Sequence, residues 1–216
     1  MTADKYISAL RYSWLTPFYD FIVGLTTRET TFKKALLSQA AIKPGYRVLD
    51  LGCGTGTLAI LAKQSQPDAE IVGIDGDAKA LRLAEDKASR SSVDIQFEQG
   101  DVTALPYPRE SFDRILSSLL FHHLSSKAKG RALQESFRVL EPGGELHLAD
   151  WGRPHGIMMR ALFLGVQLLD GFATTSDDVQ GRLPEMCVLA GFKSVVETGS
   201  YRTIFGTIRL HVCRKQ

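Results

Sequence analysis

The chain has 216 residues, of which 44% are hydrophobic and 23% are charged, and its formal net charge is +2. This length and composition fit one globular domain with a substantial core. The nearly balanced charge gives little reason to expect nucleic acid as a partner.

The first 27 residues carry many aromatic side chains, and a helix is expected after them. The aromatic residues are Tyr6, Tyr12, Trp14, Phe18, Tyr19 and Phe21. A helical pattern then covers residues 28–42 and ends at Lys43-Pro44-Gly45, because proline and glycine interrupt a helix. We interpret residues 1–27 as a cap segment that precedes the body of the domain.

From residue 47 onward, strand and helix patterns alternate. Apolar runs predict strands at residues 47–51, 70–75, 95–99, 114–119 and 145–149. Helical patterns cover residues 57–63, 78–89 and 127–140, with Asp77 as the N-cap of the second helix and Ser125 or Ser126 as that of the third. Such alternation favours a parallel sheet with helices on both faces.

The last part of the chain departs from this alternation. A helix at residues 179–189 leads through Gly191 into a strand at residues 193–197. A second strand at residues 203–213 follows after the short link 198–202. So short a link favours a hairpin, whose two strands are antiparallel.

The most informative stretch is residues 48–56, which read Val-Leu-Asp-Leu-Gly-Cys-Gly-Thr-Gly. An apolar strand ends just after the acidic residue Asp50, and Gly52, Gly54 and Gly56 alternate in the loop that follows. Glycines allow backbone angles that other residues avoid, and they let a ligand approach the main chain. Because a helix begins directly after the loop, we expect its N–H groups to be free for a ligand.

Three further motifs follow in order. Asp75 and Gly76 come at the end of the second strand, and a carboxylate there can accept hydrogen bonds from both hydroxyls of a ribose. Gly100-Asp101-Val102 follows the third strand. Residues 138–144 read Arg-Val-Leu-Glu-Pro-Gly-Gly and turn the chain into the fifth strand. Asp75 alone does not identify the ligand, because nicotinamide-dependent enzymes also place an acidic residue there.

Taken together, these motifs across residues 47–150 resemble the class I S-adenosylmethionine-dependent methyltransferases. The resemblance is closest to the menaquinone and ubiquinone C-methyltransferase type and its small-molecule relatives, and Tyr19-Asp20 adds to it. It implies an α/β fold with a Rossmann-like, doubly wound, seven-stranded sheet. That sheet would be mostly parallel, with one antiparallel strand at the C-terminal end. It also implies S-adenosyl-L-methionine as the cofactor.

The resemblance further implies the roles of individual residues. Asp50 would place the amino-acid end of the cofactor, and Asp101 would accept from the adenine amino group while the Val102 N–H meets a ring nitrogen. Asp75 would hold the ribose, and Tyr19 would cover the bound cofactor. The complete expected set is Tyr19, Asp50, Gly52, Cys53, Gly54, Thr55, Gly56, Asp75, Gly76, Asp101, Val102, Ser118, Leu119 and His123.

No catalytic residue is assigned. His122 and His123 follow the fourth strand and are weak candidates for a general base, because histidines at this place more often shape the cofactor pocket and open the next helix. A sulfonium methyl group is already activated, so alignment of the acceptor could supply much of the rate. Aromatic and methionine side chains in the segment from Asp150-Trp151 to Phe172 could line an apolar acceptor pocket.

The cysteines and the N-terminus suggest where the protein works. Cys53, Cys187 and Cys213 have neither metal-ligand spacing nor a disulfide framework, which predicts no metal site and a reducing, cytoplasmic location. We find no signal-peptide pattern. The most apolar helical segment, residues 157–169, is too short to span a bilayer, so we expect no stable membrane insertion, although peripheral contact stays open.

We therefore predict a single methyltransferase domain over residues 1–216, monomeric or homodimeric, that methylates a small apolar or aromatic molecule. Within it, residues 1–27 form the cap, 28–150 the cofactor-binding core, and 151–216 a substrate-side insertion and C-terminal hairpin. One alternative is a non-catalytic cofactor-binding protein with a regulatory or scaffold role. A nicotinamide-dependent oxidoreductase is a weaker alternative, because the G-x-G-x-G spacing and Asp101 argue against it.

Overall fold

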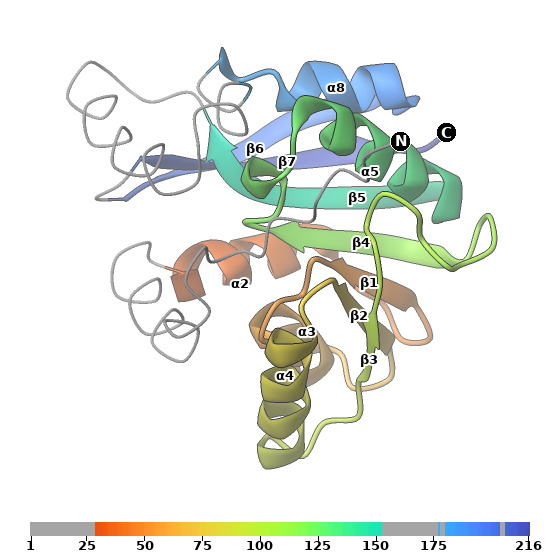
Figure 1. Ribbon diagram of the computed structural model, residues 1–216, viewed down its shortest axis with the longest axis vertical. Coiled ribbons are helices and arrows are strands. Elements are labelled where there is room, and N and C mark those ends of the chain that lie inside the picture. Colours follow the sequence, from red (N-terminus) through yellow and green to blue (C-terminus); the bar gives the residue numbers. More distant parts are fainter. Residues whose placement is uncertain (1–28, 153–176, 178–179, 204–205) are drawn as a thin grey trace.

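The computed structural model describes residues 29–152, 177, 180–203 and 206–216. In this part of the chain, a seven-stranded sheet runs through the molecule in the order β3-β2-β1-β4-β5-β7-β6 (Figure 1). The strands are β1 (Arg47–Leu51), β2 (Glu70–Asp75), β3 (Gln96–Gln99), β4 (Phe112–Ser118), β5 (Leu140–Gly152), β6 (Ser194–Arg202) and β7 (Thr207–Arg214).

The direction of the strands confirms a mostly parallel sheet with one antiparallel strand near the end of the chain. β1 pairs in parallel with β2 and β4, and the pairs β2–β3 and β4–β5 are also parallel. β7 is antiparallel to both of its neighbours, β5 and β6. β7 lies between these two strands, so the antiparallel strand is inside the sheet and β6 forms the edge.

The β6–β7 hairpin is confirmed, but its predicted turn is wrong. Residues 198–202, expected as the link, belong to β6, where Tyr201 pairs with Ile208 and Arg202 with Thr207. The chain turns instead between Thr203 and Gly206, whose backbone N–H and C=O are 2.8 Å apart. A register shift between Glu197 and Gly199 lets the strand continue through this sequence, because a bulge accommodates one extra residue without ending the ladder.

Helices pack on the sheet through two core clusters. The helices are α2 (Glu29–Ala40), α3 (Thr57–Ser65), α4 (Ala78–Arg90), α5 (Ser126–Val139) and α8 (Leu183–Ala190), with a short 3₁₀ helix η2 (Phe121–His123). One cluster joins α2 and α3 to alternate residues of the strands, including Val48 and Ile71. The other joins α5 and α8 to the intervening residues, including Leu49 and Val72. Since neighbouring strand residues point to opposite faces, the two clusters lie on opposite sides of the sheet.

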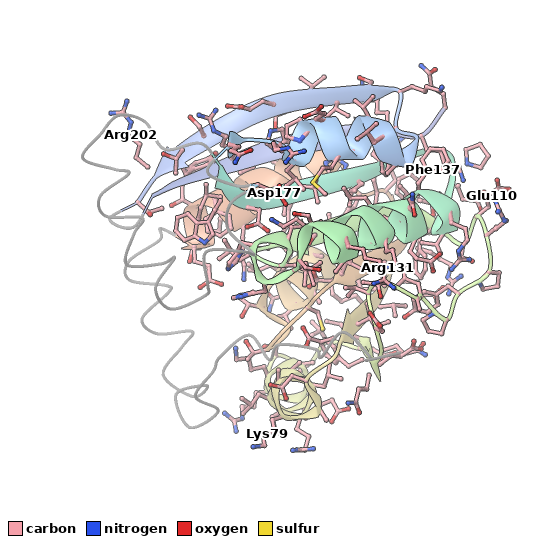
Figure 2. All side chains as sticks on the ribbon, turned by 45° about the horizontal axis from the view of Figure 1, so that its top comes forward. Lys79, Glu110, Arg131, Phe137, Asp177 and Arg202 are labelled. Atoms are coloured by element: carbon pink, nitrogen blue, oxygen red, sulfur yellow. The ribbon has the colours of Figure 1, made fainter. Side chains whose placement is uncertain are left out.

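Figure 2 shows α5 and α8 side by side, with Phe137 of α5 next to α8. The rings of Phe137 and Phe192 meet edge to face with centroids 5.3 Å apart. In the same cluster, Cys187 of α8 and Cys213 of β7 are completely buried. The hydrogen bond to Cys213 and burial both raise the pKa of the Cys187 thiol. The fold therefore brings together two of the cysteines that are far apart in the sequence.

Local sequence signals set the helix ends. The Asp77 side chain accepts a hydrogen bond from the Lys79 N–H and caps α4, as predicted. Ser125, and not Ser126, caps α5 by accepting from the Ala128 N–H. Each cap satisfies a backbone donor that the helix itself cannot, which is worth about 1 kcal/mol. Among the described residues, no helix combines the length and the apolarity needed to cross a membrane.

Candidate functional site

The glycine loop between β1 and α3 needs its glycines for different reasons. Gly52, Gly54 and Gly56 all have positive φ, at 70°, 53° and 75°. A Cβ on Gly52 would lie 2.6 Å from Leu120, and a Cβ on Gly56 would lie 2.8 Å from Ala84, whereas a Cβ on Gly54 would meet nothing within 4 Å. Gly52 and Gly56 therefore allow close packing, while Gly54 faces open space in which a ligand could approach the backbone.

The backbone N–H groups of this loop are mostly engaged within the protein, contrary to the sequence prediction. Gly52 and Cys53 donate to the Ile74 carbonyl at 2.9 and 3.0 Å, and Gly56 donates to the Cys53 carbonyl at 2.9 Å. The Gly54 N–H donates to the Asp75 carboxylate at 2.9 Å. These bonds pin the loop to the end of β2, because a buried backbone N–H requires a partner. A ligand that binds at this loop would therefore be held mainly by the neighbouring acidic side chains, and the open space at Gly54 would admit it.

Asp75 ends β2 and organises the loop. One of its oxygens accepts from the Gly54 N–H at 2.9 Å and the other from the Asp77 N–H at 2.8 Å. The residue is only 9% exposed. A carboxylate offers about four acceptor positions, so it can accept from ribose hydroxyls as well as from backbone N–H groups. The adjacent Gly76 carbonyl accepts from the Gln99 side chain at 3.1 Å, which ties this turn to β3.

Asp50 carries a buried carboxylate that lacks part of its expected hydrogen bonding. It is 1% exposed, and its Oδ2 has no hydrogen-bond partner. Burial raises its pKa from 3.8 to about 7, although the charge of Lys33 and a hydrogen bond from the Ala59 N–H act in the opposite direction. An unsatisfied buried carboxylate oxygen is costly. A ligand with a positively charged donor would remove that cost.

The other expected residues near the loop have varied surroundings. Cys53 is buried, and burial raises the pKa of its thiol. The Thr55 hydroxyl accepts from Lys87 of α4 at 2.8 Å. Asp101 is exposed and accepts from the backbone N–H and the hydroxyl of Thr103, both at 2.8 Å, whereas Val102 is buried in the core. The chain turn at Asp101 thus keeps a carboxylate oriented outside the sheet.

The end of β4 carries two more of the expected residues, Ser118 and Leu119. The Ser118 hydroxyl is buried without a hydrogen-bond partner. Leu119 has a φ of 57°, a rare conformation for a branched residue, and its N–H donates to the Ala149 carbonyl at 2.8 Å. A strained residue of this kind persists only where the surrounding structure fixes it, and such positions concentrate at functional sites.

His122 and His123 follow in η2, and Asp150 of β5 holds this turn. Asp150 accepts from the Phe121 N–H at 2.7 Å and lies 2.8 Å from Nδ1 of His122. Burial alone would raise the pKa of Asp150, but the charge of His122 and its hydrogen bond lower it. The pKa of the His123 imidazole is lowered by burial and by the neighbouring His122. The structure therefore ties His122 to a positioning contact and keeps His123 neutral.

The contact of Asp150 with η2 was not expected from the sequence, which placed Asp150 only at the start of the acceptor wall. Its position resembles that of Asp50 and Asp75, because each is an acidic residue near the carboxyl end of an apolar strand. That signal could have identified it. Tyr19, the remaining expected cofactor residue, and the acceptor-wall residues beyond 152 lie outside the described part of the chain.

Comparisons with known proteins identify the family. Residues 48–144 match the model of a methyltransferase domain. A demethylmenaquinone methyltransferase of Thermus thermophilus is 32% identical over 181 residues, which cover 81% of this chain and 81% of that protein. Another from Deinococcus radiodurans is 34% identical over 154 residues, but the match covers 70% of this chain and only 63% of that protein's length.

The chain belongs to the class I S-adenosylmethionine-dependent methyltransferases. The fold agrees with that of an S-adenosylmethionine-dependent methyltransferase from Methanosarcina mazei, with a TM-score of 0.68 at 19% identity, covering 83% of this chain and 96% of that one. The predicted family and its quinone-methyltransferase type are thus confirmed.

The residues of this methyltransferase fit the cofactor of the family. S-Adenosylmethionine carries an ammonium group, and the unpartnered Oδ2 of Asp50 is a buried acceptor beside the glycine loop. The charge of Asp75 also helps to raise the pKa of Asp50. A cationic ligand would relieve this repulsion and the burial cost together. Within the described residues, no group of three potential metal ligands is found.

Proposed function

We propose that this protein transfers a methyl group from S-adenosylmethionine to a small, apolar or aromatic acceptor. The observation that carries the proposal is the buried, unpartnered oxygen of Asp50 next to a glycine loop with open space at Gly54. A ligand without a hydrogen-bond donor would leave that oxygen unsatisfied, and an anionic ligand would also be repelled by the carboxylate. An ammonium group would donate to it in a setting where charged hydrogen bonds are strong.

Each predicted residue has a role in this proposal. Asp50 binds the ammonium group of the cofactor, Asp75 the ribose hydroxyls, and Asp101 the adenine amino group. Val102 offers its N–H to the adenine ring, and Ser118, Leu119 and His123 close the pocket at the end of β4. The remaining members of the set shape the loop or cover the cofactor, and they are Tyr19, Gly52, Cys53, Gly54, Thr55, Gly56 and Gly76.

The cofactor would supply an activated methyl group on its sulfonium sulfur. The contribution of the protein would then be to bind both reactants, orient the acceptor opposite that sulfur and exclude water, which lowers the entropic part of the barrier. The Asp150–His122 contact fixes η2 at the rim of this region. We assign no general base.

The acceptor class follows from the relatives. Two of them are named demethylmenaquinone methyltransferases, which supports a hydroxylated aromatic ring of the quinol type as the acceptor here. We also propose one domain over residues 1–216, with a cap at 1–27, the cofactor core at 28–150 and the acceptor side at 151–216. Core clusters on opposite faces of the sheet support the doubly wound arrangement.

Calorimetry with S-adenosylmethionine and S-adenosylhomocysteine tests the cofactor site directly. We expect one binding site per chain, and folded protein that binds neither compound at high micromolar concentration would refute the proposal. Transfer of a labelled methyl group to a panel of hydroxylated aromatic compounds tests the reaction. Cofactor binding without transfer to any of them would favour the non-catalytic alternative.

A further inference from the structure

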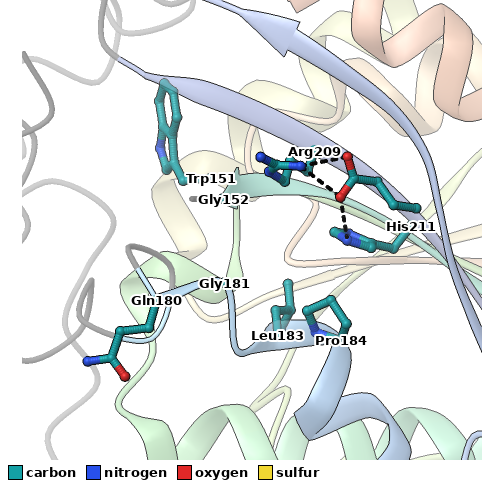
Figure 3. A pocket seen from close by; sticks show the side chains of 9 residues that line it. Trp151, Gly152, Gln180, Gly181, Leu183, Pro184, Arg209 and His211 are labelled. Atoms are coloured by element: carbon teal, nitrogen blue, oxygen red, sulfur yellow. Dashed lines mark hydrogen bonds and ion pairs between the residues drawn. The ribbon is translucent and has the colours of Figure 1, made fainter. Parts of the chain in front are cut away.

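A separate cavity of about 340 Å³ lies between the sheet and the start of α8 (Figure 3). Trp151 of β5, Leu183 and Pro184 of α8, and Glu197, Arg209 and His211 of the hairpin are among its lining residues. Its volume is at the small end of the range for ligand pockets, about 300–1,000 Å³. The mixture of apolar walls and a few polar groups is also typical of such pockets.

The cavity lies at the sheet edge that carries the cofactor site. β1, β4 and β5 are parallel, so Trp151 at the end of β5 lies at the same edge as the glycine loop at the end of β1. Asp150, the preceding residue, contacts the turn after β4 and pairs in register with Arg209 across to β7. Open α/β sheets bind ligands at this edge, so an acceptor bound in the cavity would lie beside the cofactor strands.

His211 is the most informative group in this cavity. It is 5% exposed, and its Nδ1 has no hydrogen-bond partner. Its Nε2 lies 3.9 Å from the Glu197 carboxylate. Burial lowers the pKa of His211 despite the charge of Glu197, which favours the neutral imidazole. A carboxylate can only accept, so the single proton is favoured on Nε2, and Nδ1 is then an acceptor without a donor.

Arg209 holds this arrangement in place. Its Nη1 contacts both oxygens of Glu197 at 2.6 and 2.8 Å, which fixes the carboxylate near His211 (Figure 3). The Arg209 side chain lies against the backbone of Gly152, where an added Cβ would be 2.5 Å from its Cδ. Glycine at 152 therefore makes room for the arginine. The contacts Arg209–Glu197–His211 thus keep a negative charge beside Nε2 of the imidazole before any ligand arrives.

We propose that this cavity holds the aromatic ring of the methyl acceptor and that a ring hydroxyl donates a hydrogen bond to Nδ1 of His211. The inference rests on the proposed function and names the residue that selects the acceptor. The apolar wall formed by Leu183 and Pro184 takes the ring, and the unpartnered nitrogen requires a donor. An ether or an unsubstituted ring would leave Nδ1 unsatisfied, so the cavity selects hydroxylated rings.

The test compares 2-naphthol with 2-methoxynaphthalene by calorimetry, in the presence of saturating S-adenosylhomocysteine. The two probes share the ring system, but only the naphthol can donate a hydrogen bond. We expect the wild-type protein to bind the naphthol about tenfold more tightly, as one buried hydrogen bond implies. His211→Phe keeps a ring but removes the acceptor, so it should abolish this preference. His211→Asn places an amide oxygen near the position of Nδ1 and should restore most of it.

Val196→Ala is the matched control, because Val196 is the neighbour of Glu197 in β6 and is 49% exposed. It should bind both probes as the wild type does. Far-UV circular dichroism and thermal melting check that each variant is folded. If His211→Phe fails to fold, the comparison of the two probes on the wild-type protein still tests whether the cavity prefers a hydroxylated ring.

Three results would overturn the inference. The wild-type protein could bind the two probes with equal affinity, or it could bind neither probe at millimolar concentration. Folded His211→Phe could also keep the preference for 2-naphthol. A titration with S-adenosylhomocysteine on the same samples distinguishes failure of this inference from failure of the proposed function. Protein that binds S-adenosylhomocysteine but shows no preference for 2-naphthol contradicts only the role of His211. Protein that does not bind S-adenosylhomocysteine contradicts the proposed function itself.

Discussion

Asp50→Asn should make the protein more stable above neutral pH and weaken its binding of the cofactor. The variant removes the charge from a carboxyl group that is 1% exposed and whose pKa is raised, chiefly by burial, from 3.8 to about 7. At about 1.4 kcal/mol per pH unit, the difference between these two values sets an upper bound of about 4 kcal/mol on the cost of ionising Asp50 in the folded protein.

The pKa of Asp50 is higher in the folded state, and this sets the direction in which stability changes with pH. The folded protein keeps the Asp50 proton over a pH range in which the unfolded chain has already lost it. The stability that this group contributes is therefore fully present below the unfolded pKa of 3.8 and is lost as the pH rises through about 7. The asparagine variant has no such proton. The contributions of the other titrating groups to the pH dependence of stability cancel when the two proteins are compared.

Urea unfolding at pH 5 and pH 8 measures the effect. The free energy of unfolding of the wild type minus that of the variant should fall by about 2–3 kcal/mol between these pH values. Asp77→Asn is the control, because Asp77 is an N-cap at which asparagine serves equally well. The difference in the free energy of unfolding between Asp77→Asn and the wild type should stay nearly constant with pH.

Calorimetry supplies the second measurement on the same proteins. Loss of one charged hydrogen bond, worth about 1.5–3 kcal/mol, should weaken S-adenosylhomocysteine binding by about ten- to a hundredfold in Asp50→Asn. At pH 6 the wild type should release close to one proton on binding, because the ammonium group favours the ionised carboxylate. A flat pH dependence of the stability difference, together with unchanged affinity, would refute the reasoning.

Three further predictions concern the glycine loop, Asp75 and Asp150. Asp75→Asn should weaken S-adenosylhomocysteine binding at least tenfold by calorimetry, because it disturbs both the ribose contact and the bond to the Gly54 N–H; the same affinity as in Asp77→Asn would contradict this. Gly54→Ala, which meets no atom within 4 Å, should cost only about 1–2 kcal/mol of stability while obstructing the cofactor. Gly56→Ala has a contact at 2.8 Å and should cost about 3 kcal/mol in urea unfolding; equal stability of the two variants would contradict the packing argument. Asp150→Ala removes the acceptor of η2 and should destabilise the protein by about 3–5 kcal/mol; a loss under 1 kcal/mol would show that the turn does not depend on it.

Much of the cofactor half of the molecule could be predicted from the chain because its signals are local. β1 and β2 have the predicted bounds, and Asp77 caps α4 as expected. A short apolar run of five or six residues that ends at glycine favours a buried strand followed by a turn, so the positions of Asp50 and Asp75 near strand ends could be predicted from the sequence. The hairpin was harder, because Gly199 suggested a turn where the structure has a bulge next to Glu197.

The sequence by itself determined which strands and helices form and which acidic residues stand near the strand ends, because periodicity and turn residues act over a few positions. Only the tertiary structure decided that β7 inserts between β5 and β6, and that the loop amides are already satisfied by Ile74 and Asp75. It also decided that His211 has a buried nitrogen without a donor. These features depend on which distant backbone and side-chain groups become neighbours, and hydrogen-bond satisfaction is settled only when the whole sheet has assembled.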